Sequence, residues 1–249
     1  MKIGFSALAL FESSFDQMIA RAGADGFDAV ELLCEGRYLP RQALKNILQF
    51  ETLFQYDLEL TIHSPTVDLN PASLNVGIRE ETAKQLQETA DLAAALGAST
   101  ITTHPGYVKR INDALTQRSL DSALSSLEKW AQYAKDVGIE PAIENMPHNQ
   151  KYFCTTVSQH KLFVETCGAS ATIDVGHAHT NELVQEFLQA DLPIAYHHVS
   201  DNDGKRDQHL AVGAGTIDWS SLRGIHKAII EVNDYEAVKK SREELTDKS

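Results

Sequence analysis

Short apolar segments alternate with longer amphipathic segments along the whole chain. The apolar segments are rich in β-branched residues and have the length of buried strands. They span residues 2–7, 29–33, 58–63, 99–104, 139–144, 170–174, 193–199 and 228–232. The amphipathic segments have apolar residues at helical spacing, and capping residues, proline or glycine bound several of them. These predicted helices span residues 13–23, 41–54, 76–96, 113–136, 157–167, 181–190, 218–227 and 234–246.

This alternation amounts to eight strand–helix units in 249 residues, or about 31 residues per unit. Strands that alternate with helices favour a parallel sheet, and eight such units favour a closed (β/α)8 barrel, the TIM barrel. An open doubly wound sheet is the alternative. No G-x-G-x-x-G motif follows the first strand and no P-loop occurs. No linker or compositional break divides the chain, so we expect one barrel domain over residues 1–249.

The net charge of −13 disfavours non-specific attraction to nucleic acid or to anionic lipid. No apolar run reaches the roughly 18 residues that a membrane span needs. The first residues predict a strand rather than a signal peptide. The three cysteines are odd in number and far apart, which indicates a reducing compartment, and we expect a cytoplasmic protein without disulfides. Any metal site would then use His, Asp and Glu.

Six consecutive predicted strands carry a metal-competent side chain at or near their carboxyl end. A closed barrel gathers such ends at one mouth, where barrels of this type hold their chemistry. Any one of these residues alone is more often structural, as a packed histidine or a helix cap. The whole set favours a shared site. Its members are His63, His104, Glu144, Asp174, His198 and Glu231.

Three further candidates lie in loops beyond the strands: His177, three residues after Asp174, and the pair Asp207 and His209. His179 is near these candidates but outside the pattern. His197 and His198 are adjacent in one strand, so only one of them faces the barrel interior. The remaining histidines follow no pattern, and we interpret them as surface or structural residues: His148, His160 and His226.

Imidazole and carboxylate ligands without thiolates suit zinc, manganese or a similar divalent ion. Four carboxylates converging without a cation would repel one another and raise one another's pKa. Glu144 lies in the middle of the row and is placed to bridge two ions. We therefore expect one to three divalent ions, zinc first and manganese as an alternative.

At these residues the chain resembles the xylose isomerase-like TIM barrel superfamily, which includes sugar and sugar-phosphate isomerases and epimerases as well as endonuclease IV. The resemblance covers nearly the whole chain, and it is the ordered set of motifs that is specific. The motifs are TIHSP (61–65), THPG (103–106), IENMP (143–147), IDVGHAH (173–179), HHVSDND (197–203), DQHLAVGAGTIDW (207–219) and IIEV (229–232).

The resemblance implies two ligand sets. The superfamily's one-metal isomerases and epimerases use four ligands, which fall here on Glu144, Asp174, His198 and Glu231. The register of that motif selects His198, and His197 would then pack toward the helices. The three-zinc cluster of endonuclease IV implies His63, His104 and Glu144 for one ion, the previous four residues for a second ion, and His177, Asp207 and His209 for a third.

The chain also departs from endonuclease IV. A glycine-rich DNA-gripping loop is replaced by SALALFESS (6–14), and Asn-Met-Pro-His (145–148) stands in place of Asn-Thr-Ala-Gly. The chain is shorter as well, which leaves less room for DNA-binding loops. These differences favour a small-molecule substrate over DNA.

The first hypothesis is therefore a metal-dependent isomerase or epimerase of a small sugar or sugar phosphate. Glu144 and Glu231 would exchange a carbon-bound proton through a metal-bound enediolate. Gly213 and Gly215 would bind a phosphate in the loop after the seventh strand, and Lys205 and Arg206 either remain solvated or reach a substrate anion.

The second hypothesis is a zinc-dependent phosphodiesterase of the apurinic/apyrimidinic endonuclease type, under which the partner would be nucleic acid. The third hypothesis is a barrel that binds a metal or another ligand without catalysing a reaction. No membrane partner is expected under any of them.

Overall fold

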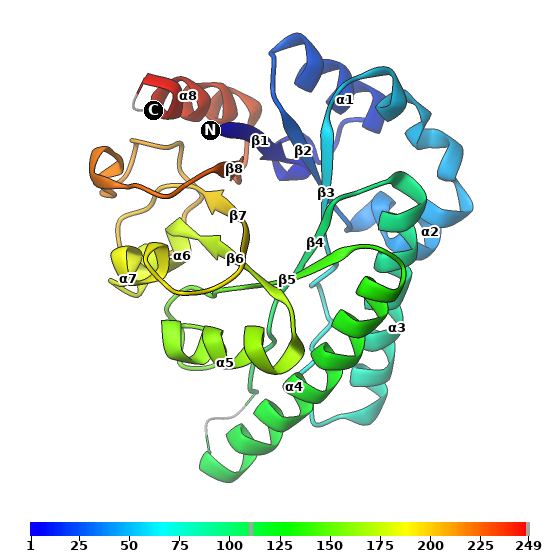
Figure 1. Cartoon of the computed structure of the whole chain (residues 1–249), viewed down its shortest axis with the longest axis vertical. Coiled ribbons are helices and arrows are strands. Elements are labelled where there is room, and N and C mark those ends of the chain that lie inside the picture. The colour runs from blue at the N-terminus through cyan, green and yellow to red at the C-terminus, as the bar shows by residue number, and fades with distance from the viewer. Residues whose placement is uncertain (110–111, 248–249) are drawn as a thin grey trace.

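Eight parallel strands close into a barrel in sequence order, β1 to β8, in the computed structural model, which describes residues 1–109 and 112–247 (Figure 1). The predicted (β/α)8 barrel is thus confirmed, and the open doubly wound sheet is excluded because β1 pairs with β8. The strands are β1 (Lys2–Ser6), β2 (Ala29–Leu33), β3 (Glu59–His63), β4 (Thr100–Thr103), β5 (Glu140–Glu144), β6 (Ser170–Asp174), β7 (Ile194–Val199) and β8 (Lys227–Ile230).

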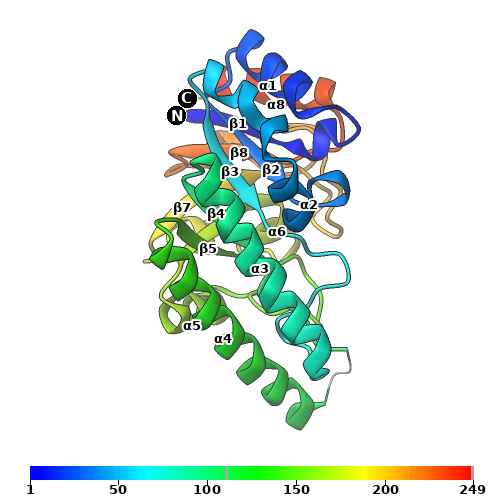
Figure 2. The same ribbon diagram turned by 90° about the vertical axis from the view of Figure 1, so that its right-hand side faces the viewer.

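The helices surround the barrel, and the two longest lie side by side on one flank (Figure 2). They are α1 (Phe15–Ala24), α2 (Pro40–Lys45), α3 (Val76–Leu96), α4 (Asp113–Asp136), α5 (Val157–Cys167), α6 (Val175–Thr180), α7 (Val184–Leu188) and α8 (Tyr235–Asp247). No helix in the described ranges is long and apolar enough to cross a membrane.

Side chains alternate between two environments along each strand, because successive residues face opposite sides of a sheet. Ile62 and Ile143 are buried in the main core between barrel and helices. Thr61 and Ala142 on the same strands have the opposite parity and face the barrel interior. This parity carries His63 and Glu144 inward at the carboxyl ends of β3 and β5, so the sequence pattern directly positions the site.

The predicted helices differ from the structure in three places. The expected helix 41–54 is divided into α2 and a 3-10 segment (Ile47–Gln55), because Asn46 leaves the helical conformation and bonds the Gln42 carbonyl with its side chain. The expected helix 218–227 is a single 3-10 turn (Trp219–Ser221). The expected helix 181–190 shortens to α7.

Helix α6 was not predicted. It begins directly after β6, where the Asp174 side chain caps it by accepting the His177 N–H at 2.6 Å. A capping oxygen at this position stabilises the first helical turn and fixes the direction in which the chain leaves the strand.

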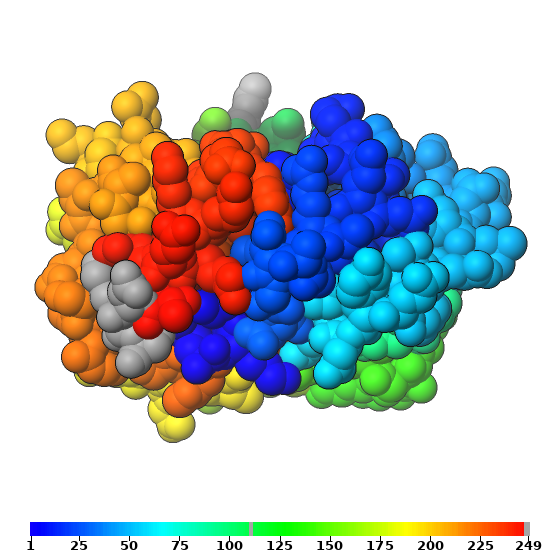
Figure 3. All heavy atoms as spheres, turned by 90° about the horizontal axis from the view of Figure 1, so that it is seen from above, coloured from blue at the N-terminus to red at the C-terminus, as the bar shows by residue number. Residues whose placement is uncertain are grey.

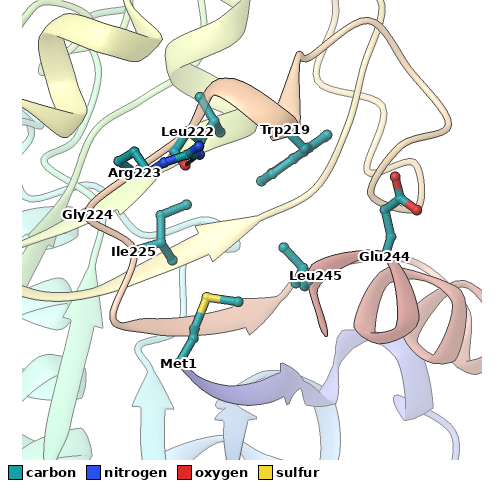
Figure 4. Close-up of a pocket in the computed structure, with 8 residues that line it drawn as sticks. All are labelled: Met1, Trp219, Leu222, Arg223, Gly224, Ile225, Glu244 and Leu245. Atoms are coloured by element: carbon teal, nitrogen blue, oxygen red, sulfur yellow. Dashed lines mark hydrogen bonds between the residues drawn. The ribbon is translucent and has the colours of Figure 1, made fainter. Parts of the chain in front are cut away.

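The last helix closes the ring against the first strand–helix unit, and the red and blue ends of the chain lie together in Figure 3. Tyr235 donates to the Asp25 carboxylate at 2.7 Å, and Arg242 donates to the Asp25 and Gly26 carbonyls. Beside α8, a groove of about 340 Å³ opens between Met1, Trp219 and Ile225 (Figure 4). Met1 precedes β1 and Ile225 precedes β8, so this groove lies at the amino end of the barrel, away from the predicted metal ligands.

Candidate metal centre

The structure brings all six predicted strand-end residues to one mouth of the barrel. His63, Glu144 and Asp174 are the last residues of β3, β5 and β6. His104 directly follows β4, and Glu231 directly follows β8. His198 is the penultimate residue of β7 and is fully buried.

The first group of candidate ligands meets on one oxygen of Glu144. Its Oε2 lies 3.3 Å from His63 Nε2 and 3.2 Å from His104 Nε2. One ligand atom from each of these three residues lies within 4.8 Å of the others. His104 is the most exposed of the three, with 31% of its side chain accessible. The group is therefore open to the mouth on the His104 side.

The second group meets on the other Glu144 oxygen. His198 Nδ1 lies 2.7 Å from Glu144 Oε1, 3.3 Å from Glu231 Oε2 and 4.0 Å from Asp174 Oδ2. These four residues also place one ligand atom each within 4.8 Å of the others. Since Glu144 belongs to both groups, its two oxygens face two adjacent candidate sites, and it would contribute an oxygen to each if both held an ion.

The third group, His177, Asp207 and His209, is joined through one carboxylate oxygen. Asp207 Oδ2 lies 3.1 Å from the Nε2 atoms of both histidines. Among the described residues, the first two groups each bring one atom per residue to within 4.8 Å of the others. The third group does not converge this closely. His209 has a positive φ of 49°, a left-handed conformation that is costly for a residue other than glycine.

Three of the histidines are oriented by the backbone. The Nδ1 atoms of His63, His177 and His209 each lie 2.8 Å from a carbonyl oxygen, those of Ser64, Asn145 and Glu231 respectively. A proton donated from Nδ1 leaves Nε2 as the nitrogen that faces the carboxylates and that could bind an ion once its own proton is lost. Metal-binding histidines commonly use the second ring nitrogen in this way.

Buried carboxylates and buried histidines shift one another's pKa at the mouth of the barrel. Burial raises the pKa of Asp174 to about 7, and repulsion from Glu144 adds to this effect. Burial opposes the charged form of His63, yet hydrogen bonding and attraction to Glu144 raise its pKa to about 9. Burial likewise opposes charge on His209, but Asp207 raises its pKa to about 10. Protons on the His63 and His209 rings thus compensate the carboxylates, whereas burial lowers the pKa of His104.

The donor set fits divalent metal. Asp174 Oδ2 and Asp207 Oδ1 are buried oxygens for which the described residues provide no hydrogen-bond donor. A buried acceptor without a partner is costly, and a cation removes that cost. Histidine nitrogens and carboxylate oxygens are the ligands that zinc takes in catalytic sites. When bound, an ion would be held by the groups described above.

Gly213 and Gly215 lie around Asp201 rather than facing the ligand groups. Gly213 donates its N–H to Asp201 Oδ2 at 3.0 Å, and a Cβ on Gly215 would lie 2.3 Å from Asp201 Oδ1. Asp201 is fully buried and also accepts from the indole of Trp219 at 2.9 Å. The observed role of these glycines is to let the loop wrap closely around this carboxylate.

Other histidines lie apart from the ligand groups. His197 is buried on the opposite face of β7, and burial lowers its pKa to about 4. His160 is buried in α5 and bonds the Ile143 carbonyl at 2.8 Å. His148 and His226 are exposed, and His179 Nε2 bonds the Thr216 hydroxyl at 2.9 Å.

Two buried residues next to the candidate ligands were not assigned to the site from the sequence. Glu31 on β2 places both carboxylate oxygens 3.1 Å from His198 Nε2. Asn145 pairs its side-chain amide with the backbone N–H and carbonyl of Asp174. The sequence offered one sign of each residue. Glu31 is a charged residue inside the apolar strand AVELL, and Asn145 directly follows the candidate ligand Glu144.

A cavity of about 210 Å³ adjoins His104 between the loops that follow β3, β4 and β5. Its walls are mainly apolar and aromatic, with Leu69, Met146, Tyr107 and Tyr152 among them. The two tyrosine rings meet edge to face with centroids 6.3 Å apart. The mouth thus offers space for a small organic molecule directly beside the first ligand group.

The family model for the xylose isomerase-like TIM barrel matches residues 19–229, and the chain belongs to this family. Among curated proteins, the uncharacterised protein MJ1311 of Methanocaldococcus jannaschii is 30% identical over 227 residues, covering 88% of this chain and 77% of that protein. This relative carries no assigned activity in its name.

Several solved structures are similar to this chain over its whole length. A D-tagatose 3-epimerase-like protein is 29% identical with a TM-score of 0.86, covering 100% of this chain and 97% of its own. A D-psicose 3-epimerase determined in the presence of D-fructose is 16% identical with a TM-score of 0.77, covering 99% and 97%. The zinc-bound IOLI protein is 19% identical with a TM-score of 0.79, covering 99% and 97%. The last two show the likeness of fold alone.

Proposed function

We propose that this protein is a divalent-metal-dependent isomerase or epimerase of a small sugar or sugar phosphate. The observation that carries the proposal is the group Glu144, Asp174, His198 and Glu231, whose ligand atoms converge within 4.8 Å at the mouth of the barrel. The cavity beside His104 supports a substrate of small size. The whole-length likeness to a D-tagatose 3-epimerase-like protein supports a sugar.

A bound divalent ion supplies Lewis-acid polarisation of substrate oxygens. The proton transfer falls to the chain's own carboxylates. Burial opposes ionisation of Glu144, but His198, His104 and His63 hold its pKa well below its usual range, so it is ionised at neutral pH. Glu231 is 13% exposed at the side chain and reaches the same space from beyond β8.

The positions of these two carboxylates suit epimerisation. In the closed barrel β5 and β8 are separated by two strands on one side and four on the other, so Glu144 and Glu231 approach the mouth from different sides. Epimerisation needs a proton removed from one face of a carbon and returned to the other. One carboxylate on each side of the substrate provides both steps by general acid–base catalysis.

The test is turnover of a panel of ketohexoses, pentuloses and their phosphates by zinc- and manganese-loaded protein, followed by chromatography of the products. We expect Glu144→Gln and Glu231→Gln each to lower kcat by roughly 100- to 10,000-fold, the range of general acid–base contributions. Glu140→Gln, at the exposed amino end of β5, is the matched control and should retain wild-type turnover. Full turnover by either site variant would refute the proposal.

A phosphodiesterase is the second candidate, and the third group favours it. His177, Asp207 and His209 complete the nine residues that the resemblance to endonuclease IV assigns to three zinc ions. A nicking assay on DNA with a single abasic site, with zinc-loaded protein, distinguishes the two. Nicking that depends on Asp207 would establish this second function, and uncut DNA at protein excess would exclude it.

A further inference from the structure

Glu31 is a buried carboxylate whose role the ligand groups do not explain. It is the central residue of β2, is fully buried, and pairs in register with Thr61 of β3 and Ser6 of β1. Its hydrogen-bond partners in the described part of the chain are the His198 ring and the Tyr196 hydroxyl. Burying a carboxylate is costly even when it is paired, so stability alone is a poor reason for its presence.

The two nitrogens of the His198 ring face different carboxylates. Nε2 lies 3.1 Å from both Glu31 oxygens and, when protonated, donates to them. Nδ1 is then the nitrogen that faces Glu144, Glu231 and Asp174. His198 is thus reversed relative to His63, His177 and His209, whose Nδ1 atoms face carbonyl oxygens and whose Nε2 atoms face the carboxylates.

Glu31 is itself held in place by a chain of hydroxyl groups across the barrel interior. The Tyr196 hydroxyl donates to Glu31 Oε2 at 2.5 Å and lies 2.6 Å from the Thr102 hydroxyl. Thr102 in turn lies 2.6 Å from the Thr172 hydroxyl. These residues come from β7, β4 and β6, so the carboxylate is fixed by strands on several sides of the barrel. A group held this firmly can orient the ring it contacts.

We propose that Glu31 is a positioning residue that holds His198 with Nε2 protonated, so that Nδ1 is its metal ligand, and whose charge strengthens metal binding by the second group. The proposal rests on the metal site of the proposed function. A carboxylate partner increases the basicity of a metal-binding imidazole more than a neutral carbonyl does. The second group, the only one of the three whose histidine is backed by a carboxylate among the described residues, is therefore the tightest zinc site.

The first test is zinc affinity measured by competition with a chromophoric chelator. Glu31→Gln keeps the shape and an acceptor oxygen but removes the charge. We expect the dissociation constant of the tightest zinc site to rise by roughly 10- to 100-fold, the usual effect of losing a group that hydrogen-bonds a metal ligand. Tyr196→Phe, which keeps the charge but frees the carboxylate, should give a smaller rise. Glu59→Gln, a part-buried carboxylate at the amino end of β3 that bonds Lys227, is the matched control.

The second test needs no variant, so it holds even where Glu31→Gln fails to fold. Nitrogen NMR of the zinc-loaded wild-type protein, labelled at histidine, should show His198 with its proton on Nε2 and the other ligand histidines with theirs on Nδ1. A proton on His198 Nδ1, or unchanged zinc affinity in folded Glu31→Gln, would overturn this proposal alone. Failure of the wild-type protein to bind zinc would overturn it together with the metal site of the proposed function.

Discussion

Glu144 is the residue that connects the two converging ligand groups, since each of its oxygens faces a different histidine set. In the metal-free protein the pKa values of His63 and His198 are raised, so these two rings carry protons that offset the carboxylate charge, whereas burial lowers the pKa of His104. Attraction to Glu144 raises the pKa of His63 to about 9 against the opposing effect of burial. Asp207 has the same effect on His209, whose pKa is raised to about 10.

Metal binding should therefore compete with protons. At neutral pH the metal-free protein holds a second ring proton, on Nε2, at His63 and His209, and metal binding there displaces it, so the apparent zinc affinity should rise with pH until the pH passes about 9 to 10. Chelator competition between about pH 6 and about pH 9 measures the slope, and calorimetry in buffers of different ionisation enthalpy counts the released protons. An affinity that is flat or falls with rising pH would contradict this account.

The individual residues of the site could be predicted from the sequence only in part. Residues that end strands were identified because a parallel barrel brings all carboxyl ends to one mouth, whatever the distance along the chain. Glu31 was missed because its partner His198 is 167 residues away and no spacing rule connects them. Asn145 was missed because it bonds the backbone of Asp174, and a backbone contact does not depend on which residue types are present in the sequence.

At the scale of elements, the loop after β7 depends on one carboxylate. Asp201 accepts N–H groups from Asn202, Gly213 and Ile217 and from the Trp219 indole, and its backbone bonds Leu210 in both directions. The loop it holds carries Asp207 and His209. Asp201 therefore fixes the element that supplies the third ligand group.

We expect Asp201→Asn to destabilise the protein by about 2–4 kcal/mol, because an amide N–H₂ would face backbone donors and leave buried N–H groups unpaired. Urea unfolding measures this loss. Asp203→Asn, an exposed change in the same loop that keeps an acceptor for the Lys205 and Arg206 N–H groups, should stay within about 0.5 kcal/mol of wild type. Equal stability of the two variants would show that the carboxylate does not hold the loop.

Helices were predicted less well than strands, for a local reason. The eight strands are buried on both faces, so their apolar runs are unmistakable, and all eight were found. Helix α6 contains glycine and two histidines and depends on the Asp174 cap rather than on an apolar stripe. The 3-10 segment 47–55 keeps a helical pattern of apolar residues although Asn46 interrupts the hydrogen bonding before it.

At the scale of the whole molecule, metal binding should contribute to folding stability. Four carboxylates and the histidines of the mouth come from strands and loops around most of the barrel, and they converge only in the folded chain. A ligand that binds the folded state at about 1,000 times its dissociation constant stabilises it by about 4.1 kcal/mol. For a chain of this size that corresponds to a rise in Tm of roughly 8–16 °C.

Thermal unfolding with excess zinc and with chelator measures this difference. The Glu144→Gln protein, which lacks the shared carboxylate charge, should show a much smaller shift. A wild-type Tm that is the same with zinc and with chelator would contradict a metal centre that links these strands.

The most direct measurement of the central claim is hydrogen exchange at a substrate carbon. Metal-loaded protein is incubated in deuterium oxide with D-tagatose, D-fructose and D-psicose, and proton NMR follows loss of the carbon-bound hydrogen signals. We predict deuterium incorporation at one carbon by the wild-type protein together with formation of the epimer or isomer, and loss of both in Glu144→Gln and Glu231→Gln. Product formed without deuterium, or exchange that persists in both variants, would contradict proton transfer by these carboxylates.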